Sequence, residues 1–540
     1  MHAAARVRTW YGLLSLAGLV ILGTLPLPHV DSDAPLYGKI AANVLATGDW
    51  LSFHHPGWFV DKPPVVFWLM AGSFKMLGVS DVTLRLWQVI LALVLVVVTA
   101  RVARAAGWTR EEAALSALVL ATSLQFLYQT TVPQQDLPLT FFLTLAALGL
   151  LRYLDRHSPA WLAAAAAAAA AAVLTKGIAG LGFFGLLAVL ALLVARPGLP
   201  RPGRLLGHLV LAAVVFAALA VPWFALGVIR QGDQFVQTFL TSGTLGLARF
   251  FRPAISTPPP YWLSVFAYVP LLLVGLLPWT PLLLVGLGDL PRLVRSGTRG
   301  EKFVAVWLVG FFALLSLSSG DKVFRYLLVC FPPAALLTGR TAAAFLGHPR
   351  RLRLAAWIAV VPGLLMMAAG FLMVWMQYAS QRALLAGVVL PTVAATAAGL
   401  LGFAVAALRG RGPTAVVLAT LGILAGMALF ERGMVAHAAV LNPWPAIRAA
   451  AAPAAGEGGR LFLYGRAGEG FNFAHFYFDR PVVALSGPSE LAAVWARERV
   501  TAVIPEEEYD DLARALTPAP VVIHRSPARL VLVTNHGRAD

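Results

Sequence analysis

Long apolar runs recur along most of the chain, from Tyr11 to Phe430, and constrain its fold more than any other feature. A run of roughly 20 apolar residues crosses a bilayer as an α-helix, which satisfies its backbone polar groups internally. Hydrophobic residues make up 59% of the chain and charged residues only 12%, whereas about 25% charged residues is usual in soluble domains. The sequence therefore predicts a polytopic all-α membrane protein and excludes a soluble enzyme for most of the chain.

We expect thirteen transmembrane helices. They cover roughly residues 11–27, 83–105, 113–130, 137–154, 160–175, 177–195, 205–228, 261–285, 303–318, 324–340, 354–376, 384–407 and 414–430. The first run follows Arg6 and Arg8 and so resembles a secretory signal, but no small-residue cleavage site follows it, which favours a retained anchor. The alanine run 163–172 is typical of helices that pack closely in lipid.

The net charge of +17 is best explained by membrane topology. Lys and Arg gather in every second loop between the apolar runs, as the positive-inside rule requires of cytoplasmic loops. A nucleic-acid-binding protein would place its basic residues on one continuous face, so that class is not favoured. We expect a bacterial inner-membrane protein whose N-terminus is cytoplasmic and whose residues after Phe430 are periplasmic. The single cysteine, Cys330, excludes a disulfide framework.

The predicted organisation is a transmembrane catalytic domain, 1–430, followed by a small periplasmic α/β domain, 431–540. Two outer loops, 28–82 and 229–260, are long enough to be functional, and the first contains two helical stretches. In the C-terminal domain, apolar strand-like runs alternate with helical segments. The expected strands are 461–464, 481–485, 500–504, 521–524 and 530–533. We expect this domain to support the catalytic domain or to gate its substrates.

Acidic residues are scarce before Glu431, which makes the search for chemistry tractable. A carboxylate near a bilayer is costly, so one at a helix end is a functional candidate. Three aspartates stand out by their settings: Asp33 follows the first span, Asp61 precedes a Lys-Pro-Pro sequence, and Asp136 lies in a hairpin between two spans. Asp31, Asp49, Asp81 and Asp233 are better explained as solvated or helix-capping residues.

Five basic residues share the outer membrane depth expected for these aspartates. They are Lys62, Arg85, Lys176, Lys322 and Arg325. Any one of them could simply extend from a helix end to the membrane interface. Five of them on the side of the membrane that should be poor in Lys and Arg favour a different explanation, an anionic lipid headgroup as their ligand. We therefore expect these cations to bind a phosphate and the carboxylates to act on a hydroxyl or an amine.

The order of these segments resembles one family. The segments are 33–41, Asp61-Lys62-Pro63-Pro64, Arg85-Leu86, Asp136-Leu137-Pro138, Leu174-Thr175-Lys176-Gly177 and 317–333 with Lys322 and Tyr326. The chain resembles the lipid A 4-amino-4-deoxy-L-arabinose transferases, within the protein O-mannosyltransferase superfamily of GT-C membrane glycosyltransferases. The resemblance implies a GT-C fold and the transfer of a sugar from a polyprenyl phosphate to lipid A or another envelope acceptor, outside the cytoplasm.

The resemblance also implies roles for individual residues. Asp33 is the candidate catalytic carboxylate, with Asp61 and Asp136 beside it, while Tyr37 and Tyr326 line the substrate site. Two positions depart from the family. Asp61 stands where the family usually has Glu, which affects a contact to the sugar or to a metal. Residues 34–36 lack the acidic residue and the arginine that are common there, which affects which sugar and which acceptor are used. No cofactor is certain.

The expected chemistry follows from the leaving group. A sugar on a polyprenyl phosphate departs without a general acid, provided that cations balance the charge on the phosphate. Asp33 acts as a base if the acceptor is a hydroxyl, and orients the sugar or stabilises positive charge if the acceptor is itself a phosphate. A divalent metal at Asp61 with His54, His55 or Asp33 is a weaker prediction. Transfer to protein, a lipid transporter or flippase and a non-catalytic scaffold are the alternatives.

Overall fold

The computed structural model describes residues 3–31, 33–53, 62–195, 198–237, 261–318, 322–346, 348, 350, 352–358, 364–365, 368, 372, 382–452 and 460–536. The first half of the chain is helical. Its helices are α1 (Ala3–Gly23), α2 (Asp33–Thr47), α3 (Val65–Leu77), α4 (Asp81–Ala105), α5 (Arg110–Ala121), α6 (Leu124–Thr131), α7 (Asp136–Arg156), α8 (Pro159–Lys176), α9 (Ile178–Ala195), α10 (Pro202–Gln231) and α11 (Asp233–Val236).

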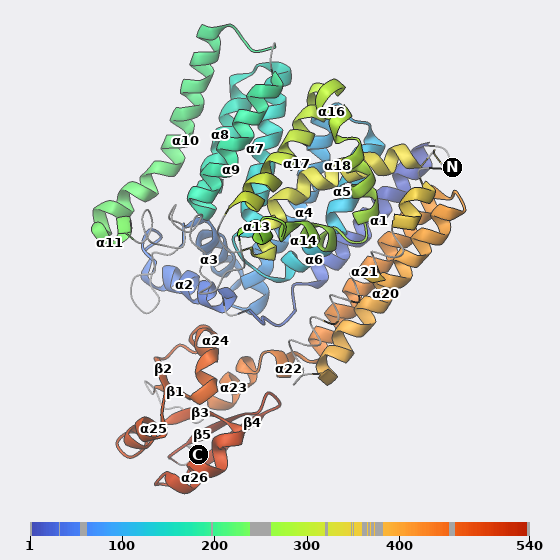
Figure 1. The fold of residues 1–540 in the computed structure, drawn as a ribbon. Coiled ribbons are helices and arrows are strands. Elements are labelled where there is room, and N and C mark those ends of the chain that lie inside the picture. The colour runs from blue at the N-terminus through green and yellow to red at the C-terminus, as the bar shows by residue number, and fades with distance from the viewer. Residues whose placement is uncertain are drawn as a thin grey trace.

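Helices continue to residue 451. They are α13 (Tyr261–Ser264), α14 (Tyr268–Gly275), α15 (Thr280–Gly288), α16 (Leu290–Ser296), α17 (Arg299–Leu317), the 3-10 helix η2 (Phe324–Cys330), α18 (Phe331–Phe345), α20 (Arg382–Leu408), α21 (Gly412–Ala436), α22 (Ala438–Leu441) and α23 (Trp444–Ala451). Figure 1 shows the long helices as one bundle, with α20 and α21 paired along one side and α10 standing at the other.

Within the described part of the chain, ten helices are long and apolar enough to cross a membrane, or eleven if the bent pair α5 and α6 counts as one span. The prediction of a polytopic helical membrane protein is therefore confirmed, but the count of thirteen is not. The expected span 354–376 lies mostly outside the described residues. The expected span 261–285 is not one helix: it is divided among α13, α14 and α15, because Pro270, Pro278 and Pro281 each remove a backbone donor.

The hairpin of α7 and α8 brings two distant helix ends together. Its helices are antiparallel, so the start of α7 and the end of α8 lie on the same side of the bundle. They pack closely through small residues: a Cβ on Gly149 would lie 2.9 Å from the Cβ of Ala165 and 3.0 Å from the carbonyl oxygen of Trp161. The alanine run of α8 therefore permits close helix packing, as expected.

Both helical stretches expected in the first outer loop are present, as α2 and α3. They pack against each other and lie between the transmembrane bundle and the C-terminal residues (Figure 1). Tyr37 of α2 contacts Phe67 of α3, with ring centroids 5.6 Å apart, in a core that also includes Trp444 and Phe476. This second apolar core joins the outer loop to the C-terminal part of the chain.

Residues 438–534, the C-terminal α/β domain, contain a five-stranded sheet. Its elements after α22 and α23 are β1 (Leu461–Tyr464), the 3-10 helix η4 (Gly465–Gly470), α24 (Phe471–Tyr477), β2 (Val482–Leu485), α25 (Pro488–Trp495), β3 (Thr501–Pro505), α26 (Glu506–Ala515), β4 (Val521–Ser526) and β5 (Leu530–Thr534). The strand order is β2-β1-β3-β5-β4; β1 is parallel to β2 and β3, and β5 is antiparallel to β3 and β4. All five expected strands are found within a residue or two of their predicted limits.

Candidate active site

Asp136 and Lys176 form an ion pair at the end of the α7–α8 hairpin. Asp136 is the first residue of α7 and Lys176 the last residue of α8, and the hairpin places them together. Nζ of Lys176 lies 2.5 Å from Oδ1 of Asp136. Asp136 is only 2% exposed, so its charge is paired inside the protein and not in bulk water. A buried carboxylate requires such a partner, because an unpaired charge inside a protein is strongly destabilising.

Asp33 begins α2 and lies beside the loop that precedes Asp136. Nε2 of Gln134 lies 3.3 Å from Oδ2 of Asp33 and also donates to Oδ2 of Asp31. Oδ1 of Asp31 accepts a hydrogen bond of 2.9 Å from the backbone N–H of Asp33, which caps the start of α2. Burial raises the pKa of Asp31, with a contribution from the neighbouring charge of Asp33.

Arg325, in η2, connects the two carboxylates. Its guanidinium lies 3.9 Å from Oδ2 of Asp33 and 3.6 Å from Oδ2 of Asp136, and its side chain is 35% exposed. The next residue, Tyr326, places its ring 4.1 Å from Nζ of Lys176. The predicted residues Asp33, Asp136, Lys176, Arg325 and Tyr326 are therefore brought into one cluster, which we call the outer cluster.

A cavity of about 380 Å³ adjoins the outer cluster. Asp31, Gln134 and Arg325 form its polar wall. The rest of the lining is largely apolar: Leu124, Tyr128, Gln129, Val132, Val323 and Phe324. A cavity lined by both charged and apolar side chains suits an amphiphile that has an anionic head.

The structure places Arg85 differently from the prediction. Its residue is 1% exposed, and Nε, Nη1 and Nη2 all bond to groups of the protein, including three carbonyl oxygens of the segment after α1. A guanidinium enclosed in this way offers no face to a phosphate. Arg85 is therefore corrected from a phosphate ligand to a buried structural residue.

Lys322 also differs from its expected role. Its ammonium donates to the carbonyl oxygens of Leu315, Ser316 and Ser318 at the end of α17, where carbonyl groups have no partner within the helix. Burial lowers the pKa of Lys322. The three protons of the ammonium are used at this helix end, so the structure does not support Lys322 as a phosphate ligand.

Of the other expected residues, Tyr37 and Lys62 are described by the structure. Tyr37 is 4% exposed and packs in the second apolar core, so it presents little surface to a substrate. Lys62 is half-buried just before Pro63 and α3. Asp61 and both His54 and His55 lie outside the described residues. Among those that are described, no group of three His, Cys, Asp or Glu side chains could hold a metal ion.

Gln134 and Asp31 lie beside the outer cluster but were not predicted as site residues. The signal for Gln134 was available, because Gln134-Gln135-Asp136 is a polar run within an otherwise apolar hairpin. Asp31 was interpreted as a solvated or helix-capping residue. It does cap α2, and it also shares Gln134 with Asp33.

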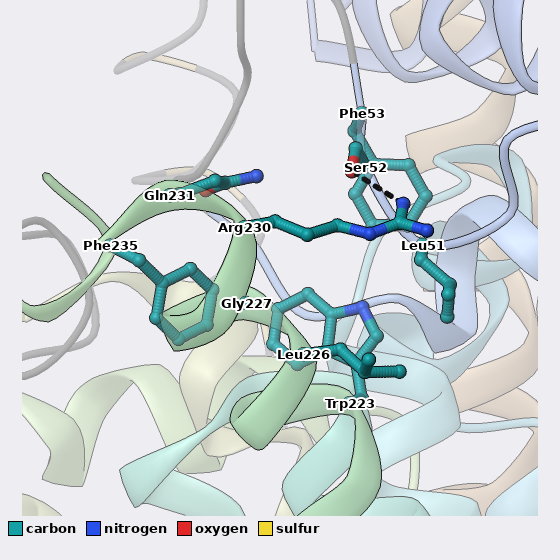
Figure 2. A pocket seen from close by; sticks show the side chains of 9 residues that line it. All are labelled: Leu51, Ser52, Phe53, Trp223, Leu226, Gly227, Arg230, Gln231 and Phe235. Carbon is teal, nitrogen blue, oxygen red and sulfur yellow. Dashed lines mark hydrogen bonds between the residues drawn. The ribbon is translucent and has the colours of Figure 1, made fainter.

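The segment after α2 is bound to α10 by a separate set of contacts. Arg230 donates to Oδ1 of Asp49 at 3.1 Å and to Oγ of Ser52 at 3.2 Å. Burial by itself raises the pKa of Asp49. Hydrogen bonds from the N–H groups of Leu51 and Ser52, together with the charge of Arg230, outweigh burial and hold this pKa below its ordinary value. Figure 2 shows Arg230 extending over Trp223 toward Ser52. The cavity there is only about 10 Å³, enough for one water molecule, so this contact is structural.

Known proteins resemble this chain both in sequence and in fold. The profile of the dolichyl-phosphate-mannose-protein mannosyltransferase family matches residues 61–277. The undecaprenyl phosphate-alpha-4-amino-4-deoxy-L-arabinose arabinosyl transferase of Pseudomonas aeruginosa (strain UCBPP-PA14) is 28% identical over 352 residues, which cover 62% of this chain and 60% of that protein. The protein of the same name from Aeromonas salmonicida (strain A449) is 26% identical over 360 residues, covering 64% and 62%.

The sequence match thus spans about 60% of the length of these relatives. The structural match is longer. The crystal structure of ArnT from Cupriavidus metallidurans bound to undecaprenyl phosphate superposes with a TM-score of 0.76 over 99% of both chains, at 21% identity. Its apo structure gives a TM-score of 0.75 at 22% identity, again over 99% of both chains. The chain therefore has the GT-C fold of ArnT, and it is similar to the 4-amino-4-deoxy-L-arabinose transferases and, more distantly, to the protein O-mannosyltransferases.

Proposed function

We propose that this protein is a membrane glycosyltransferase that transfers a sugar from undecaprenyl phosphate to lipid A or another envelope acceptor. The observation that carries the proposal is the outer cluster: two carboxylates and two cations from four distant segments meet beside a cavity with apolar walls. The names of the relatives support 4-amino-4-deoxy-L-arabinose as the sugar and undecaprenyl phosphate as its carrier.

In the proposed reaction, the bond between the anomeric carbon and the phosphate oxygen breaks, and its electron pair stays on the phosphate. Lys176 and Arg325 balance that charge, while Asp136 holds both cations in place. The acceptor oxygen forms the new bond to the anomeric carbon from the opposite face. If the acceptor is a hydroxyl, Asp33 takes its proton; if it is an ionised phosphate, Asp33 orients the sugar or stabilises positive charge on it.

We place the outer cluster on the periplasmic side of the inner membrane, with the N-terminus in the cytoplasm and the C-terminal α/β domain in the periplasm. The distribution of Lys and Arg among the loops supports this orientation. Asp61 and Lys62 complete the site in this proposal, and Asp61 is the candidate ligand of a divalent ion. Activity that survives EDTA treatment would remove the ion from the proposal.

Mass spectrometry of lipid A and envelope glycans tests the function directly. A deletion strain is complemented with the wild type, with Asp33→Ala, or with Asp233→Ala as a matched control, because Asp233 is an exposed carboxylate at the start of α11. We expect the added sugar to return with the wild type and the control but not with Asp33→Ala. Glycolipids and glycoproteins that remain unchanged after deletion would exclude the transferase function.

Transfer to protein is the second candidate, supported by the mannosyltransferase profile that matches residues 61–277. The same strains distinguish it. A modified glycoprotein that disappears on deletion, with lipid A unchanged, would favour a protein acceptor over lipid A.

A further inference from the structure

Arg85 binds two chain segments that lead into the outer cluster. Its Nη1 donates to the carbonyl oxygens of Thr24, Leu25 and Leu27 at 3.0, 2.9 and 2.7 Å, all in the segment between α1 and α2. Its Nε donates to the carbonyl oxygen of Thr131, the last residue of α6, at 2.9 Å. A single guanidinium therefore fixes the separation of these two segments.

Each of these segments continues directly to a carboxylate of the outer cluster. The first runs from Leu27 to Asp31 and Asp33. The second runs from Thr131 to Gln134, whose amide bonds to both of those aspartates, and then to Asp136. The positions of the cluster's acids relative to one another thus depend on the bonds of Arg85.

His29 connects Arg85 to the start of α4. Its Nδ1 lies 3.1 Å from Nη2 of Arg85, and because a guanidinium can only donate, Nδ1 must accept. The ring proton is then on Nε2, which donates to the carbonyl oxygen of Asp81 at 3.2 Å. Burial, with the nearby charge of Arg85, holds the pKa of His29 well below its usual range, so the ring is neutral.

Asp81 is in turn bound by the C-terminal α/β domain. The hydroxyl of Tyr477 donates to Oδ1 of Asp81 at 2.5 Å and accepts from Nδ2 of Asn442 at 2.8 Å. Tyr477 ends α24, a helix of that domain that packs against α2 (Figure 1). Its neighbour Phe476 packs on α2 so closely that a Cβ on Gly38 would lie 2.7 Å from its ring.

We propose that the C-terminal α/β domain positions the acids of the outer cluster through the series Tyr477, Asp81, His29 and Arg85, four positioning residues that need not touch substrate. The series crosses from one domain to the other by the hydrogen bond between the side chains of Tyr477 and Asp81. It continues from the backbone carbonyl of Asp81 through His29 to Arg85, and ends on the backbone of both segments that carry the cluster. Its effect on rate rests on the proposed transferase function, whereas its effect on local structure does not.

Tyr477→Phe is the variant that tests the series, because it removes one hydroxyl and leaves the aromatic packing. Tyr464→Phe is the matched control: Tyr464 is a buried tyrosine of the same domain, in β1, whose hydroxyl interacts with Glu508 and not with the bundle. Hydrogen exchange of the full-length protein in detergent reports the local structure. We expect about fivefold faster exchange in residues 24–31 and 131–136 for Tyr477→Phe only, the effect of one lost hydrogen bond.

Kinetics supply the second measurement. We expect kcat to fall about fivefold in Tyr477→Phe while the Kd for undecaprenyl phosphate, measured without the sugar, stays within about twofold of wild type. A merely structural hydroxyl would lower Tm without accelerating exchange in those two segments.

The two outcomes separate the inference from the proposed function. Exchange in residues 24–31 and 131–136 that matches the Tyr464→Phe control would overturn the series, whatever the activity. A wild-type protein that transfers no sugar would overturn the proposed function, while the exchange measurement would still decide whether the domain acts on these segments.

Discussion

Nζ of Lys176 lies 2.5 Å from Oδ1 of Asp136, and this ion pair joins the two ends of the α7–α8 hairpin. The opposite oxygen of Asp136 faces the guanidinium of Arg325 at 3.6 Å. One buried carboxylate therefore orients the two cations of the cluster, while 35% of the Arg325 side chain stays exposed to a ligand.

Asp136→Asn separates two effects of this carboxylate: its orientation of Lys176 and Arg325, and its influence on the binding of the lipid phosphate. The variant removes one negative charge, so we expect undecaprenyl phosphate to bind at least as tightly as to wild type, because the cluster becomes more positive. Lys176 and Arg325 lose their shared acceptor, and we expect kcat to fall about a hundredfold. Isothermal titration and single-turnover assays measure the two effects. A weaker affinity for the lipid, with kcat unchanged, would contradict this role.

Asp33→Asn distinguishes the two classes of acceptor. The amide cannot take a proton, so transfer to a hydroxyl acceptor should be abolished, whereas transfer to an ionised phosphate should only be weakened. The measurement is a reconstituted assay in which donor and detergent are the same and the acceptor is varied. Equal loss with both acceptors would show that Asp33 does not act as a base.

Lys322→Gln and Lys176→Gln should affect different properties. The first removes the ammonium that bonds the carbonyl end of α17, so we expect a loss of about 1–3 kcal/mol of stability and a donor affinity close to wild type. The second removes a cation of the outer cluster and should weaken binding of undecaprenyl phosphate about tenfold or more. Thermal unfolding and lipid titration on both variants check this. A large loss of affinity in Lys322→Gln would return that lysine to the phosphate site.

Asp31 should make stability depend on pH. Its pKa is raised in the folded protein, so the unfolded chain loses this proton first, and the contribution of Asp31 to the free energy of unfolding falls as pH rises from about 4 through the folded pKa. Asp31→Asn keeps an oxygen for the N–H of Asp33 but carries no charge. We expect the Tm of this variant, relative to wild type, to increase between about pH 4 and pH 7. Melting curves that stay parallel across this range, as expected for the exposed control Asp233→Asn, would refute the assignment.

Hydropathy and charge predict much of the fold and part of the cluster. Asp33 and Asp136 stand out because a carboxylate at the membrane edge needs a partner, and Lys176 and Arg325 are those partners. The strands of the C-terminal sheet were also predictable, because their apolar runs are short and separated by turns.

Arg85 could not be assigned from the sequence. Hydropathy places a cation at the outer edge of α4, but its partners are backbone carbonyls exposed where α1 and α6 end, and sequence patterns do not show how such ends meet. The same holds for Lys322, whose acceptors belong to the end of α17. Residues 261–285 do not form the single helix that was expected, because the prediction gave their apolar composition more weight than their prolines.

The close contact at Gly149 has a consequence for variation in this protein. Gly149 is about 20 Å along α7 from Asp136 at 1.5 Å per residue, deep among lipid-facing helices and remote from any sugar. A larger side chain there would push α8 away or slide it, and a slip of one turn would move Lys176 by about 5.4 Å. In the proposed transferase, residues in the middle of the helix bundle would therefore also influence the reaction rate, and a variant library limited to the polar residues of the outer cluster would miss them.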